Sequence, residues 1–95
     1  MEYIIAFLNT NAAIKAEQCL LEQKLSVGVM PLPSQIRAGC GICLRINQDE
    51  ISAAVKTLSD NGNFEITLFS RTAENGKYSY IEENTTKWRA QDENS

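Results

Sequence analysis

The stretch AGCGIC, residues 38–43, contains two of the chain's three cysteines and places Gly39 and Gly41 on either side of Cys40. Glycines beside a loop cysteine allow positive φ angles and the close approach of another molecule, so we expect them to expose the thiol. Successive main-chain amides in such a turn can converge on an anion, here a thiolate or a bound persulfide. The pattern therefore indicates a reactive thiol at Cys40.

A nearby cation would stabilise such a thiolate and increase its reactivity. Arg37 and Arg45 are the local candidates for that cation. The alternative interpretation is equally open at this point: Cys40 is a small buried residue that begins a strand, and the two glycines serve only the turn.

Cys43 completes a Cys-x-x-Cys spacing, which redox proteins use at the start of a helix. Here the alternating sequence ICLRI, residues 42–46, predicts a strand. Side chains alternate across a strand, so Cys40 and Cys43 would point to opposite faces unless the chain breaks near Gly41. We interpret Cys43 as a secondary thiol, more readily a packing residue on the open face of a sheet than a resolving thiol.

The composition narrows the chemistry further. The 95 residues carry a net charge of −3 and include no histidine, which excludes Ser/His and Cys/His catalysis and removes the commonest zinc ligand. We therefore predict no metal site and no cofactor, leaving as a weaker hypothesis four thiolates from Cys40 and Cys43 across a dimer.

The same composition bears on partners and location. The basic residues are scattered rather than clustered, so we expect no nucleic-acid partner. No apolar run approaches the roughly 20 residues of a membrane span, and the N-terminus lacks signal-peptide features. Three cysteines, an odd number, argue against a disulfide framework. We expect a cytoplasmic protein that does not bind a membrane.

Periodicity predicts the elements that would position these residues. We expect strands at 3–8, 27–32, 42–46 and 64–69, a helix at 11–24, a second helix after Asn47, and a hairpin at Asn75-Gly76 leading to a strand at 78–83. The order β-α-β-β-α-β with an appended C-terminal hairpin strand is that of an α+β, ferredoxin-like split βαβ sandwich. Both helices would cover one sheet face and leave the other open or available for association. Residues 1–83 would form one domain and 84–95 a polar, flexible tail.

Four polar signals refine the helices. Thr10 or Asn11 can cap the first helix, and Asn47 with Glu50 has the spacing of a capping box for the second. Asn61-Gly62 would stop the second helix. Glu17 lies near the middle of the first helix's apolar stripe, where it either organises the amides of the Gly39–Gly41 loop or is an edge residue that reaches solvent.

The segment PLPSQIRAGCGICLRI, together with Ala13 and Glu17 in the Ala-x-x-x-Glu pattern of the preceding helix, resembles the selenium/sulfur carrier protein-like family of short bacterial domains. The matching segment positions are Pro33, Ile36, Cys40, Gly41, Leu44 and Arg45. The resemblance covers roughly residues 3 to 70. Ser34, Arg37 and Ala38 depart from the family pattern, and the position of Cys43 is usually a small residue, so the resemblance does not imply a paired-thiol mechanism.

The resemblance implies a carrier of reactive sulfur or selenium, a transfer module more than a turnover enzyme. Cys40 would accept the atom as a persulfide or selenopersulfide from a donor protein and pass it to an acceptor protein. The alternative hypothesis is a non-catalytic ferredoxin-like interaction or regulatory module that forms a homodimer through its open sheet face, with structural cysteines.

Overall fold

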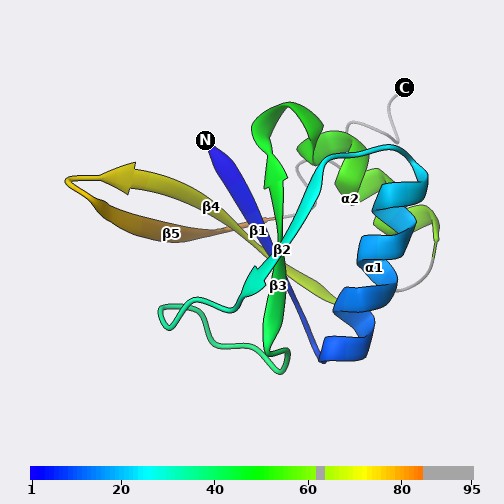
Figure 1. Cartoon of the computed structure of the whole chain (residues 1–95), viewed down its shortest axis with the longest axis horizontal. Helices are drawn as coiled ribbons and strands as arrows, with labels where there is room; N and C mark the ends of the chain where they lie inside the picture. The colour runs from blue at the N-terminus through cyan, green and yellow to red at the C-terminus, as the bar shows by residue number, and fades with distance from the viewer. Residues whose placement is uncertain (62–63, 85–95) are drawn as a thin grey trace.

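The computed structural model of the chain describes residues 1–61 and 64–84. The elements in chain order are β1 (Glu2–Phe7), α1 (Thr10–Glu22), β2 (Val27–Pro31), β3 (Ile42–Asn47), the short 3-10 helix η1 (Gln48–Glu50), α2 (Ile51–Asp60), β4 (Ile66–Glu74) and β5 (Lys77–Glu83). The strands form one sheet in the order β2-β3-β1-β4-β5, and every neighbouring pair is antiparallel. Both helices lie on one side of this sheet (Figure 1). The fold is therefore a small α+β domain.

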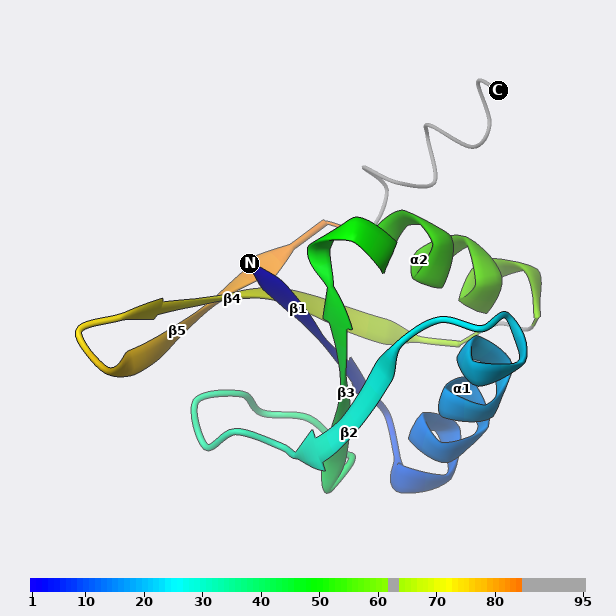
Figure 2. The same ribbon diagram turned by 45° about the horizontal axis from the view of Figure 1, so that its top comes forward.

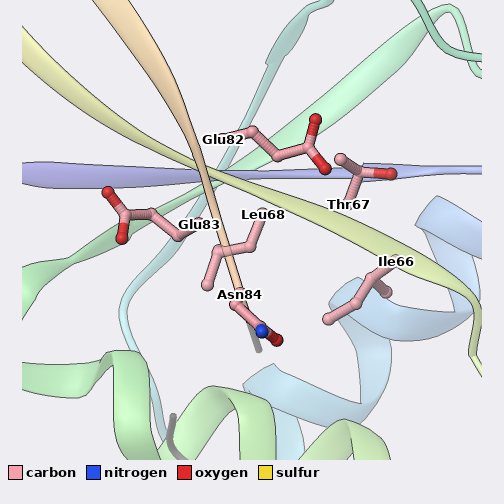
Figure 3. Close-up of a pocket in the computed structure, with 6 residues that line it drawn as sticks. All are labelled: Ile66, Thr67, Leu68, Glu82, Glu83 and Asn84. Atoms are coloured by element: carbon pink, nitrogen blue, oxygen red, sulfur yellow. The ribbon is translucent and has the colours of Figure 1, made fainter. Parts of the chain in front are cut away.

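The helix-side face of the sheet forms the main apolar layer. Ile66 and Leu68 point from β4 toward the helices (Figure 3), and the register places Tyr3, Ile5 and Leu44 on the same face. The helices contribute buried side chains at Ala13, Ala16, Leu20, Ile51, Ala54, Val55 and Leu58. The spacing of the last four, i, i+3, i+4 and i+7, produces one apolar stripe on α2.

The other face of the sheet is not open at its centre, contrary to our expectation. Ile4, Ala6 and Cys43 point to that face and are at most 1% exposed. The β2–β3 loop, residues 32–41, lies on the side of the sheet away from the helices (Figure 2). Ile36 of this loop is buried with the core. A single chain therefore already covers the middle of its second face.

The helix starts differ from the predicted caps. Asn9, rather than Thr10 or Asn11, caps α1, and its side-chain oxygen accepts a 2.8 Å hydrogen bond from the amide of Ala12. The Asn47–Glu50 capping box is also wrong, because Asn47 makes no side-chain cap bond. The carboxylate of Glu50 instead accepts hydrogen bonds of 3.2 and 3.3 Å from the amide of Ser26. The donor to the Glu50 carboxylate is therefore an amide 24 residues earlier in the sequence and not the predicted amide of Asn47.

The C-terminal hairpin confirms the strongest turn signal. Asn75 and Gly76 adopt φ angles of 52° and 77°, the left-handed conformation of a two-residue hairpin turn. Pairing with β5 extends β4 to Glu74, well beyond the predicted end at residue 69. The helix α2 ends at Asp60, before the predicted stop, of which Gly62 lies outside the described residues. The predicted tail also lies outside them except for Asn84.

Candidate functional site

Cys40 lies where the β2–β3 loop meets the connection between β1 and α1. The amide of Phe7, at the end of β1, donates a 3.2 Å hydrogen bond to the Cys40 sulfur. The amide of Gly41 donates a 3.3 Å bond to the hydroxyl oxygen of Thr10, in the first turn of α1. Cys40 is only 3% exposed, so the expectation that the flanking glycines expose the thiol is wrong.

The two flanking glycines differ in what the structure requires of them. Among the described residues, Gly76 has a positive φ whereas Gly39 and Gly41 do not. A Cβ on Gly39 would collide with the carbonyl oxygen of Leu8, whereas a Cβ on Gly41 would meet only the Thr10 hydroxyl oxygen at 3.9 Å. Gly39 is therefore needed for close packing of the loop against the end of β1.

Cys43 is the second buried cysteine of this region, close enough to Cys40 for Cys40 to affect its pKa. The chain bends at Gly41 before β3 begins, so the alternation that would place the two cysteines on opposite faces does not extend to Cys40. The Cys43 thiol is fully buried and donates a 3.8 Å hydrogen bond to the carbonyl oxygen of Pro31. Burial, together with the nearness of Cys40, raises the pKa of Cys43 from 9.0 to about 11. Both cysteines are free thiols.

The cation that affects the pKa of Cys43 is Arg71, a residue that the sequence did not identify. Arg71 is 8% exposed, its Nε donates a 3.1 Å hydrogen bond to Glu2, and its guanidinium carbon lies 4.2 Å from the centre of the Tyr78 ring. Its Nη1 reaches within 3.8 Å of the sulfur of Met30, which pairs with Cys43 across β2 and β3. Its positive charge lowers the pKa of Cys43, against the larger effect of burial.

The other predicted site residues, Arg45, Arg37 and Glu17, make no hydrogen bond to either thiol among the described residues. Arg45 points to the same face as Cys43, but its side chain is 48% exposed and its Nη1 lies 3.6 Å from a carboxylate oxygen of Glu2. Arg37 is an exposed residue of the β2–β3 loop, and Glu17 is half-buried on α1. Among the hydrogen bonds of the described chain, Thr10 rather than Glu17 holds an amide of the glycine loop.

Two further observations concern ligands. The described residues contain no group of three or more His, Cys, Asp or Glu side chains that could hold a metal ion. A hollow of about 440 Å³ lies instead at the far end of β4 and β5, lined by Ile66, Thr67, Leu68, Glu82, Glu83 and Asn84 (Figure 3). Its lining includes no cysteine, so it is separate from the thiol pair.

None of the described helices has the length and apolar character of a membrane span.

These features define a small α+β domain with two buried thiols, one at the end of the β2–β3 loop and one near the start of β3. The family model described as "Putative Se/S carrier protein-like" matches residues 2–69, from the start of β1 into β4. The chain belongs to this family. No curated protein and no solved structure matches the chain.

Proposed function

We propose that this chain carries reactive sulfur or selenium between a donor protein and an acceptor protein in the cytoplasm. Cys40 is the carrier thiol. The observation that supports this most is that Cys40 lies in the family-matched region with its sulfur held by the Phe7 amide. A main-chain N–H is the kind of donor that holds a sulfur anion in place.

Loading of sulfur onto Cys40 is a thiol exchange reaction. The Cys40 thiolate attacks the outer sulfur of a donor persulfide, the donor's S–S bond breaks, and the donor leaves as a thiolate. Cys40 is then a persulfide, and an acceptor thiol removes the outer sulfur by the same reaction. Selenium would be carried in the same way as a selenopersulfide. The chain is thus a transfer protein that is regenerated by each delivery.

Because Cys40 is buried, loading requires the β2–β3 loop to move. The bonds from the Gly41 amide to Thr10 and from the Phe7 amide to the Cys40 sulfur join the cysteine end of this loop to β1 and α1. Segments held by few hydrogen bonds open at low cost compared with global unfolding. We infer that a donor protein reaches Cys40 when this end of the loop lifts.

We also assign residues 1–83 to the ferredoxin-like group, with residues 84–95 as a tail. The assignment is supported by β3 lying between β1 and β2 and by β1 lying between β3 and β4. The alternative, a module that dimerises through an open sheet face, has less support because Ile4 and Ala6 on that face are already buried.

Glutathione persulfide tests the carrier function. Intact-mass analysis of the Cys43→Ala protein should show one added sulfur atom, and the Cys40→Ser/Cys43→Ala protein should show none. Cys19→Ser/Cys43→Ala is the matched control, because Cys19 lies on α1, and it should load like Cys43→Ala. Circular dichroism checks that each variant is folded. Absence of the adduct, or equal adducts with and without Cys40, would overturn the proposal.

A further inference from the structure

We propose that Cys43 is a resolving thiol that discharges the sulfur carried on Cys40 as hydrogen sulfide and closes an internal Cys40–Cys43 disulfide. This inference rests on the proposed function, because it needs a persulfide on Cys40. It adds a second outcome to the carrier: delivery to an acceptor protein, or release of the sulfur in reduced form.

The placement of the two sulfurs supports this step. The β1–β3 register pairs Ile5 with Leu44, so Cys43, which precedes Leu44 on the antiparallel strand β3, lies beside Ala6. The Cys40 sulfur accepts its hydrogen bond from the amide of Phe7, the next residue of β1. The bend at Gly41 therefore returns Cys40 to the same end of β1 that Cys43 borders.

The surroundings of Cys43 suit a held nucleophile. The thiol is fully buried, and its acceptor, the Pro31 carbonyl oxygen, is a long contact of 3.8 Å that a reacting thiol can leave at little cost. The titratable and charged side chains around it are Cys40 of the loop, Arg71 of β4, which is hydrogen-bonded to Glu2, and Arg45 on the same face of β3. The positive charge of Arg71 favours the Cys43 thiolate.

The step balances without an external oxidant. The Cys43 sulfur attacks the inner sulfur of the Cys40 persulfide, a new Cys40–Cys43 S–S bond forms, and the bond to the outer sulfur breaks. The outer sulfur takes the electron pair and the Cys43 proton, and with its own hydrogen leaves as hydrogen sulfide. Cys43 is oxidised to the level of a disulfide while the carried sulfur is reduced. A dithiol reductant then restores both thiols.

Protonation makes this discharge slow near neutral pH. Only the thiolate attacks, and burial keeps the pKa of Cys43 at about 11. The rate should therefore rise about tenfold per pH unit between neutral pH and about pH 10. A carrier loaded at neutral pH keeps its sulfur long enough to meet an acceptor.

The experiment loads the full chain with glutathione persulfide, removes excess reagent by gel filtration, and follows sulfide and intact mass over time. The native chain should gain one sulfur atom and then convert to a species lacking two hydrogens, with one sulfide released per chain. Cys43→Ala and Cys43→Ser should load but release sulfide at least tenfold more slowly. Cys19→Ser should behave like the native chain, and peptide mapping should locate the disulfide at Cys40 and Cys43.

The outcomes separate the two proposals. Loading on Cys40 followed by equal sulfide release with and without Cys43 overturns the resolving role and leaves the carrier function standing. Failure of Cys43→Ala to load overturns the carrier function itself. If one Cys43 variant does not fold, the other provides the comparison. A disulfide between two chains, recognised by its mass, also overturns the internal step.

Discussion

The amide of Phe7 donates a hydrogen bond to the sulfur of Cys40 over 3.2 Å, joining the end of the central strand β1 to a loop residue 33 positions later. The pairing of β1 with β3 ends at Ile5 and Leu44, and the Cys40 sulfur accepts a hydrogen bond from the β1 amide two residues later, that of Phe7. Cys40 therefore closes the end of the sheet and is at the same time the candidate carrier thiol. Any change that shifts the loop should affect both stability and thiol chemistry.

Gly39→Ala should lower the free energy of unfolding by about 1 to 3 kcal/mol, because its Cβ would collide with the Leu8 carbonyl oxygen. Gly41→Ala is the matched control, with its nearest contact at 3.9 Å, and should change stability by about 0.5 kcal/mol or less. Urea unfolding measures both. Equal losses in the two variants would contradict the close packing of Gly39 against β1.

The Cys43 thiol should make stability fall at alkaline pH. Its pKa is about 11 in the folded chain and 9.0 as its ordinary value, so the folded state holds the proton more tightly. This contribution is complete below about pH 9 and is lost as the pH rises toward 11. Burial also raises the pKa of Tyr3 above its ordinary value of 10.0.

The comparison with Cys43→Ala isolates the contribution of the cysteine. Between pH 8 and 11, the unfolding free energy of the native chain should decline more steeply than that of Cys43→Ala, because both retain Tyr3. Urea unfolding at a series of pH values measures the difference. Parallel curves for the two proteins would show that Cys43 is not held as a buried neutral thiol.

The ion pair between Glu2 and Arg71 should make stability fall at acidic pH. The hydrogen bond from Arg71 lowers the pKa of Glu2 below 4.5 despite partial burial, so the folded state binds this proton less tightly. The contribution is complete above about pH 4.5 and is lost as the pH falls through the lowered value.

Glu2→Gln should remove that dependence. It should also destabilise the chain by about 1 to 3 kcal/mol at neutral pH, because buried Arg71 loses its carboxylate partner. Glu74→Gln, which removes an exposed carboxylate at the end of β4, is the control and should leave the acid dependence unchanged. The pair would be unimportant if Glu2→Gln unfolded with the native pH profile.

Gly76→Ala should destabilise the β4–β5 hairpin by about 1 kcal/mol, because its φ of 77° is disfavoured for a residue with a Cβ. Asn75→Gly should be close to neutral, since glycine tolerates the φ of 52° at that position. Thermal unfolding of the two variants measures the difference. A neutral Gly76→Ala would contradict the two-residue turn.

The sequence alone predicted the elements whose signals are local. The i, i+3, i+4, i+7 spacing from Ile51 to Leu58 and the Asn75-Gly76 turn both led to the observed structure, because periodicity and turn chemistry act between neighbouring residues. Cys40 was identified by its neighbours in sequence, and residues 2–69 match the family that this segment resembles.

Tertiary structure decided the surroundings of that cysteine. The carboxylate of Glu50 accepts a hydrogen bond from the amide of Ser26, and the sulfur of Cys40 accepts one from the amide of Phe7. The cation that lowers the pKa of Cys43 is Arg71 rather than a residue of the loop. These partners are distant in sequence. They are set by strand order and register, which cannot be read from the spacing of neighbouring residues. The bend at Gly41 likewise ends the strand alternation before Cys40, and the fold buries both cysteines.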